Sequence, residues 1–212
     1  MGKLLSGISG GFTGKVGANI GYVLNGQNIV RALPHVNHRR TAGQKANSQK
    51  MTVVNKFFYH MSALLKVGFS IAARGTTKNY YNLAVSYNKK YALKGEYPEI
   101  EMDYPNVLIS QGSLLPAINP VVEVVPEGLK FSWDQAHSSD SHRDNDQVML
   151  LAYAPGSGNI RMIRYGAERS EGFETLHIID DMLSEPVETY ISFINDERTA
   201  VATSIYTGRI GG

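Results

Sequence analysis

Apolar positions near the start of the chain fall into two short runs around a single turn signal. Residues 17–24 and 27–33 are β-prone, and Asn25-Gly26 separates them. Asn and Gly both tolerate the positive φ of a type I′ turn, so this dipeptide is a strong local signal for a β-hairpin. An isolated hairpin is marginal in water, and its faces therefore need cover from the rest of the chain or from another molecule.

Two helical segments are predicted after the hairpin. Apolar residues recur at three- and four-residue spacing over about 24 residues, with Thr41 as a candidate N-cap and Gly68 as a candidate stop. The same spacing returns at Tyr80 for about 15 residues and ends at Gly95. We therefore expect two helices between the hairpin and the second half of the chain.

Short β-like runs dominate the second half. Prolines punctuate the chain from Pro98 to Pro126, around one short run at Val107–Ser110. Seven further runs follow at regular spacing, with turn signals between them, and this pattern indicates a β-sandwich. The seven runs cover residues 120–125, 128–133, 146–154, 159–165, 173–179, 187–194 and 200–207.

The fold class predicted from these elements is α+β. We expect a Gly-rich extended arm at 1–14, a basic hairpin-helical domain with its connector at 15–116, and an acidic β-sandwich domain at 117–212. The C-terminal half resembles a fibronectin type III or immunoglobulin-like sandwich, because Trp133 closes its second strand and residues alternate over 187–193. Such sandwiches carry many functions, so this resemblance implies a fold and no activity.

Charge is segregated along the chain. All nineteen Asp and Glu lie after residue 95, whereas residues 1–95 carry fourteen of the twenty-one Lys and Arg. The formal net charge of +2 is therefore about +14 on one part and about −12 on the other. An asymmetry of this size favours a polyanionic partner, or docking onto the acidic part of another copy. A third reading is that the charges pair within one molecule.

Five segments occur in one order along the chain: Gly10–Gly17, Gly21–Gly26, Val30–Pro34, Tyr81–Asn88 and Ile109–Leu114. With these segments the whole chain resembles an uncharacterised protein family of about 210 residues from Bacteroidetes. The resemblance implies no activity, cofactor or catalytic residue.

Motifs for enzyme or cofactor chemistry are weak. The segment 10–17 differs from a phosphate-binding loop, because Ser9 replaces its first Gly and Val16 replaces its hydroxyl residue. With no Cys there are no thiolate sites, and no nucleophile-elbow or zinc-protease signature is present. We expect no enzyme and no cofactor. A weak ion site is the alternative to a solvated acidic loop for His137, Asp140, His142, Asp144 and Asp146.

These features predict a non-enzymatic structural protein that self-associates head to tail, such as a subunit of a filament, tube or virion-like particle. The alternative is a nucleic-acid-binding protein that uses its basic half. We expect no membrane span, signal peptide or small-molecule substrate, and a cytoplasmic or particle-associated location. The predicted basic interface is Lys15, Arg31, Arg39, Arg40, Lys45 and Lys50, and the predicted acidic interface is Asp140, Asp144, Asp146, Asp180, Asp181 and Glu185.

Overall fold

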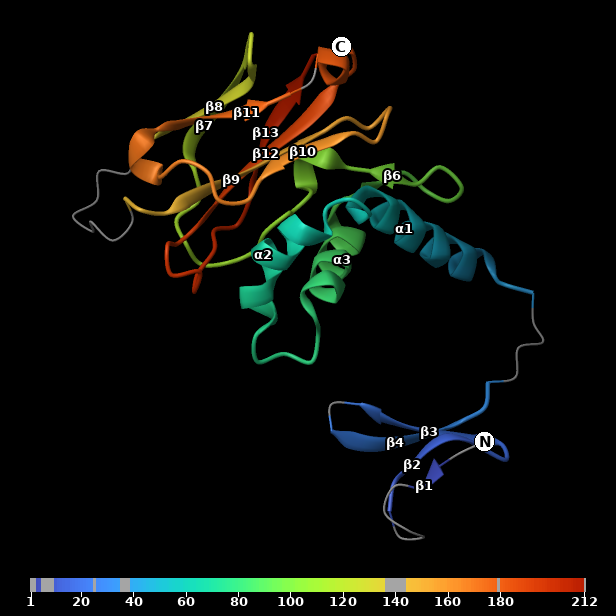
Figure 1. Cartoon of the computed structure of the whole chain (residues 1–212). Helices are drawn as coiled ribbons and strands as arrows, with labels where there is room; N and C mark the ends of the chain where they lie inside the picture. Colours follow the sequence, from blue (N-terminus) through green and yellow to red (C-terminus); the bar gives the residue numbers. More distant parts are fainter. Residues whose placement is uncertain are drawn as a thin grey trace. The chain divides into compact units, whose positions relative to one another are not determined.

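The chain divides into two compact units, an N-terminal unit of residues 1–41 and a larger unit of residues 42–212 (Figure 1). The predicted boundary at residue 116 falls inside the larger unit. The structure is a computed structural model, and it describes residues 3–4, 10–24, 26–34, 39–135, 144–178 and 180–211.

The N-terminal unit is an antiparallel sheet with the strand order β1-β2-β3-β4. The predicted hairpin is confirmed: Leu24 pairs with Gln27, so the connection is a two-residue turn, and Gly26 has a φ of 78°. Part of the predicted arm also pairs, since Lys3 lies opposite Thr13. The strands are β1 (Lys3–Leu4), β2 (Phe12–Val16), β3 (Asn19–Leu24) and β4 (Gln27–Ala32).

The described residues of the larger unit form three α-helices, α1 (Ala42–Phe58), α2 (Ser62–Ala73) and α3 (Tyr80–Tyr91). The prediction of two helices is wrong, because the first segment breaks after α1. The Met61 amide donates to the Phe58 carbonyl at 3.0 Å in a tight turn, and α2 starts in a new direction. No helix in the described part of the chain is both long and apolar enough to span a membrane.

Gly68 lies inside α2 and does not end the helix. An added Cβ at this position would stand 2.3 Å from the Ile109 carbonyl oxygen, so glycine permits close packing of the helix on the connector. The Gln111 amide donates to the Gly68 carbonyl at 3.0 Å in the same contact. From the sequence spacing alone, Gly68 is predicted to end the helix.

Seven strands of the larger unit form two antiparallel sheets, of order β11-β8-β7 and β10-β9-β12-β13. Six of the predicted runs match their strands closely. The last strand begins later than predicted, and Val107–Ser110 is not a strand. The strands are β7 (Ile118–Val125), β8 (Gly128–Asp134), β9 (Gln147–Tyr153), β10 (Ile160–Ile163), β11 (Phe173–His177), β12 (Val187–Ile194) and β13 (Ile205–Ile210), and β5 (Leu93–Lys94) pairs with β6 (Glu101–Met102).

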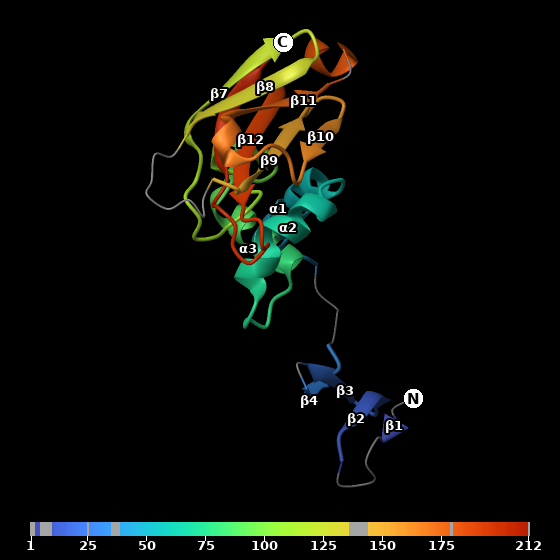
Figure 2. The same cartoon turned by 60° about the vertical axis from the view of Figure 1, so that its left-hand side comes forward.

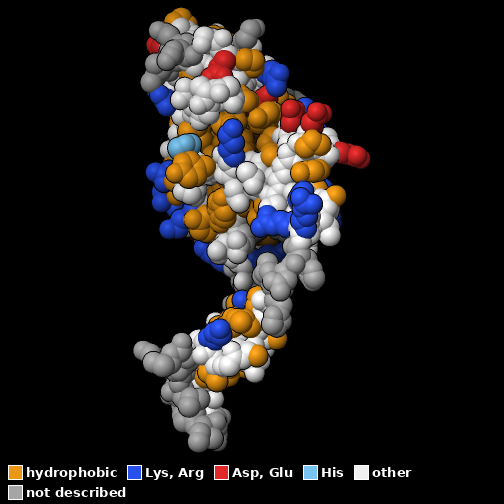
Figure 3. Space-filling view, turned by 90° about the vertical axis from the view of Figure 1, so that its right-hand side faces the viewer, with side chains coloured by type: hydrophobic (Ala, Val, Ile, Leu, Met, Phe, Trp, Pro, Cys, Tyr) orange, Lys and Arg blue, Asp and Glu red, His pale blue; other side chains and the backbone are white. Residues whose placement is uncertain are grey.

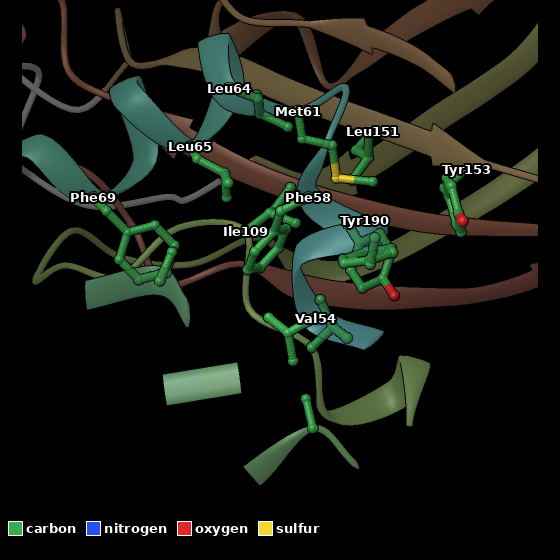
Figure 4. Packing of buried hydrophobic residues seen from close by; sticks show 14 of the residues in the cluster. Val54, Phe58, Met61, Leu64, Leu65, Phe69, Ile109, Leu151, Tyr153 and Tyr190 are labelled. Atoms are coloured by element: carbon green, nitrogen blue, oxygen red, sulfur yellow. The ribbon is translucent and has the colours of Figure 1, made fainter. Parts of the chain in front are cut away.

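Two apolar cores lie on opposite faces of the four-stranded sheet. Leu129 and Phe131 of β8 share one core with Ile191 and Phe193 of β12. The second core joins the same sheet to the helices, and Figure 4 shows Tyr190 near Val54, Phe58 and Met61. Every residue of β12 is buried. The helices therefore pack on the sheet within one unit, as Figure 2 also shows, and the fold is mixed α+β as predicted.

The connector between the helices and β7 is held by buried polar groups. The Ser110 hydroxyl donates to Ser192 Oγ at 2.7 Å, and the Leu108 amide donates to the Asn88 side chain at 2.9 Å. The Arg169 guanidinium donates to the Leu115 carbonyl at 2.7 Å. Buried donors and acceptors that are all paired stabilise one conformation of such a segment, because each would be costly if left alone.

Candidate assembly surfaces

Both faces of the N-terminal sheet are open. Opposite residues in an antiparallel pair share a face. By this register, Val16, Val23 and Val30 lie on one face, and their side chains are 49–56% exposed. Phe12 packs over Gly21 on the same side. Large apolar side chains on both faces stay in contact with solvent, and no described residue of this unit belongs to a buried apolar core.

The opposite face combines apolar and basic side chains. Lys15, Ile20 and Arg31 lie in one cross-strand row, and Tyr22 lies opposite Ile29 in the next row. Tyr22 is 37% exposed, and the Arg31 guanidinium lies 6.0 Å from the centre of its ring. We call this the basic face: Lys15, Ile20, Tyr22, Leu24, Ile29 and Arg31.

The six predicted basic interface residues do not belong to one unit. Lys15, Arg31, Arg39 and Arg40 belong to the N-terminal unit, and all four are exposed. Lys45 and Lys50 lie on α1 of the larger unit instead. Neither unit alone therefore brings all six residues into one basic patch.

A basic groove of about 560 Å³ lies between α1 and α3. Its walls carry Lys50, Lys89 and Lys90, with Asn47 and Asn82 as neutral donors. Amines and amides of this kind can contact phosphate oxygens. On the face seen in Figure 3, most Lys and Arg of the larger unit lie towards its helical end, and Asp and Glu lie towards the other end.

The structure removes Asp146 from the predicted acidic interface. It is 2% exposed and pairs with Arg169, itself 1% exposed, at 3.2 Å. The Arg169 guanidinium also lies 3.7 Å from the Phe193 ring centre, and the Trp133 indole donates to the Arg169 carbonyl at 2.9 Å. Asp146 therefore stabilises the interior of the larger unit and contributes nothing to its surface. The prediction failed because a run of acidic residues in the sequence does not indicate which side chain is buried.

The other predicted acidic residues differ in their environments. Asp144 is exposed, whereas Glu185 is half-buried and accepts a bond from the Ser157 amide at 3.0 Å. Asp180 and Asp181 lie in a 3-10 helix, Asp180–Ser184. Asp140, His137 and His142 lie outside the described residues. Among the residues that the structure describes, no cluster of three or more His, Asp or Glu could hold a metal ion.

A second open face lies on the three-stranded sheet. Val121 of β7, Ser132 of β8 and Phe173 of β11 form one row across the sheet, and Glu123, Lys130 and Thr175 form the next. The neighbouring residues of β8 point into the core, so these rows point outward. The alternation of apolar and polar residues over 129–133 in the sequence could have identified both the core side of β8 and this outward face. We call it the acidic outer face: Val121, Glu123, Lys130, Ser132, Asp134, Glu171, Phe173 and Thr175, whose three carboxylates outnumber the one ammonium group of Lys130.

This outer face is apolar at its two edges and acidic around them. Val121 is 51% exposed and Phe173 is 50% exposed. A groove of about 610 Å³ lies on the face, with Asp134 and Glu171 in its walls. The Lys130 ammonium lies 4.8 Å from the centre of the Phe173 ring. The face therefore offers apolar area next to carboxylates.

The largest pKa shifts belong to a tyrosine cluster around a buried carboxylate. Glu188 is 1% exposed and pairs with Arg209 at 2.7 Å, and the Tyr206 hydroxyl donates to it at 2.6 Å. Burial raises the pKa of Tyr104 to about 12, with a further contribution from nearby Tyr153. Burial also raises the pKa of Tyr190, whose hydroxyl donates to the Tyr104 carbonyl at 2.9 Å. The raised pKa values keep these two phenols protonated at neutral pH, where the cluster serves as a structural feature.

Comparison with known protein families identifies the family of this chain. A family model described as a family of unknown function (DUF6266) matches residues 11–208. No curated protein and no solved structure matches the chain.

Proposed function

The chain belongs to this family of unknown function, and we propose its function from its own surfaces. We propose that it is a non-enzymatic structural protein that self-associates. The observation that carries the proposal is the N-terminal sheet, which leaves apolar side chains exposed on both faces. Burial of such side chains stabilises by about 1.5–3 kcal/mol each when complete. A second molecule can supply that burial, and a chain with one donor unit and one acceptor unit can assemble head to tail.

The charge distribution supports the same proposal. The N-terminal unit carries five Lys and Arg and no Asp or Glu, whereas all nineteen acidic residues lie in the larger unit. Opposite charges on two units of one chain attract a copy in a head-to-tail orientation and disfavour contacts between like units. Such contacts can build filaments, tubes or virion-like particles, and a particle-associated location fits these assemblies.

The experiment compares the intact chain with residues 42–212 by light scattering and negative-stain microscopy. The shortened chain keeps both apolar cores, because the buried residues of these cores all lie beyond residue 53. We expect assemblies from the intact chain and monomers from the shortened one. Assemblies that persist without residues 1–41 would contradict the proposed role of the N-terminal unit.

The finer fold assignment is also a proposal. We infer that the seven strands of the larger unit form a fibronectin type III or immunoglobulin-like sandwich. Two observations support it: the division into three and four strands, and the exchange of the chain between sheets after β8, after β10 and after β11. An origin of the family in Bacteroidetes likewise stays a prediction.

Nucleic-acid binding is the second candidate function, and the groove between α1 and α3 favours it. Lys50, Lys89 and Lys90 line that groove, and no acidic residue occurs before residue 96 to oppose a phosphate chain. The test is a titration with DNA and RNA at two salt concentrations. Binding that weakens steeply with salt and is lost on Lys50→Ala with Lys89→Ala would establish it, and no binding at low salt would exclude it.

A further inference from the structure

We propose that the basic face of the N-terminal sheet docks on the acidic outer face of the β11-β8-β7 sheet of a second copy. The inference rests on the proposed function and names the two surfaces that meet. Each is one face of an antiparallel sheet, and such faces pack at a separation of about 10 Å.

The donor surface is apolar in its centre and basic in one row. Ile20 and Ile29 are half-buried, and Leu24 is 52% exposed. Lys15 and Arg31 lie in the same row as Ile20, and both are exposed. An apolar face with a basic row requires a partner that supplies apolar area and carboxylates together.

The acceptor surface supplies both. Val121 and Phe173 are about half exposed at the two ends of one row, and Glu123 lies on β7 in the next row. Asp134 and Glu171 border the groove on this face. The carboxylate of Asp134 is fixed by the Asn119 amide, which donates to it at 2.7 Å. Burial of the two apolar side chains would stabilise the contact, and the carboxylates would set its orientation.

Charge selects this pairing over the obvious alternatives. Two basic faces stacked on each other would bring Lys15 and Arg31 of both copies together, which is unfavourable. A nucleic acid would neutralise the two cations but would leave Leu24 and Ile29 against a polar backbone. The acidic outer face of another copy offers apolar side chains and three carboxylates, Glu123, Asp134 and Glu171, against which Lys130 is a single cation.

The test uses two charge-reversed full-length variants, separately and mixed. The donor variant carries Lys15→Glu and Arg31→Glu, and the acceptor variant carries Glu123→Lys and Glu171→Lys. Each variant alone places like charges on both surfaces, so we expect the dissociation constant for self-association to rise about tenfold or more at low salt. In the mixture each donor meets an oppositely charged acceptor, and we expect association to return. Circular dichroism checks that each variant is folded.

Matched controls make the same charge changes elsewhere on the larger unit. Lys66→Glu with Lys78→Glu, and Asp196→Lys with Glu197→Lys, alter exposed residues outside both faces. We expect these variants to associate nearly as the natural chain does.

The outcomes separate this inference from the proposed function. A natural chain that stays monomeric contradicts both. If the natural chain assembles through residues 1–41 but the charge-reversed variants assemble equally well, only the inference is overturned. Variants that dissociate but are not restored by mixing also overturn it, because that result places the contact within one chain or on another surface.

Discussion

Arg169 links several parts of the interior of the larger unit. It joins Asp146, the connector carbonyls of Leu115 and Pro116, and the ring of Phe193. A buried pair is costly to break, because the remaining partner keeps an uncompensated charge in the interior. Asp146 could not be recognised as that partner from the sequence, since its neighbour Asp144 is exposed and no local pattern distinguishes the two.

We predict that Arg169→Met destabilises the chain by about 3–5 kcal/mol. Urea unfolding followed by the fluorescence of Trp133, the only Trp, measures this change. The double variant Arg169→Met with Asp146→Asn provides the control, and it should recover part of the loss because no buried charge remains. A single variant that loses less than about 1 kcal/mol would contradict the structural role of the pair.

The tyrosine cluster predicts a loss of stability at alkaline pH. The pKa of Tyr104 is raised by burial to about 12, above its ordinary value of 10.0. A phenol whose folded pKa is raised contributes stability below the unfolded pKa, and this contribution is lost as pH rises from about 10 to about 12. Thermal melts across this range should therefore show a falling Tm.

Two single variants test the assignment to Tyr104. Tyr104→Phe should make the alkaline fall in Tm shallower, because one titrating buried phenol is gone. Tyr59→Phe is the matched control, since the Tyr59 side chain is 75% exposed, and it should leave the slope unchanged. If Tm fell equally steeply with pH in both variants, Tyr104 would not be a cause of the alkaline loss of stability.

At the scale of elements, two helical glycines predict opposite effects of the same substitution. Gly68→Ala places a Cβ against the Ile109 carbonyl and should destabilise by about 1–3 kcal/mol. Gly43→Ala lies in α1 with open space around it and should stabilise by up to about 1 kcal/mol. Chemical denaturation of both variants measures the difference, and a neutral Gly68→Ala would contradict the close contact between α2 and the connector.

The elements that could be predicted from the sequence are mostly those with local signals. The hairpin at Asn25-Gly26 and six of the seven late strands follow from turn residues and alternation over a few positions. The extra helix break near Met61 could not be predicted in this way, because it allows both α1 and α2 to pack on the distant β9 and β12. Non-local packing of this kind leaves no periodic signal in the chain.

At the scale of the whole molecule, the charge of the chain changes sign at a different residue from the division into compact units. The sign of the charge changes after residue 95, whereas the compact units divide at residue 41. Three basic helices therefore share a unit with the acidic sheets, because Val54, Phe58 and Leu65 are buried against those strands. Apolar contacts, which a charge count does not include, determined the division.

The N-terminal unit is the part whose stability should depend on assembly. Hydrogen exchange of β3 and β4 amides should be slow in assembled protein and fast in dilute protein, because their cover comes from a second molecule. The amides of β12, which is buried throughout, provide the internal control and should be protected in both states. Strong protection of β3 and β4 in dilute protein would contradict this dependence.

The central claim is that the intact chain associates with itself, and sedimentation velocity over a range of protein concentrations at low salt tests it most directly. We predict sedimentation coefficients that rise with concentration and fall on addition of salt, because exposed opposite charges drive the contact and salt screens them. A single monomeric boundary at high concentration and low salt would contradict the claim.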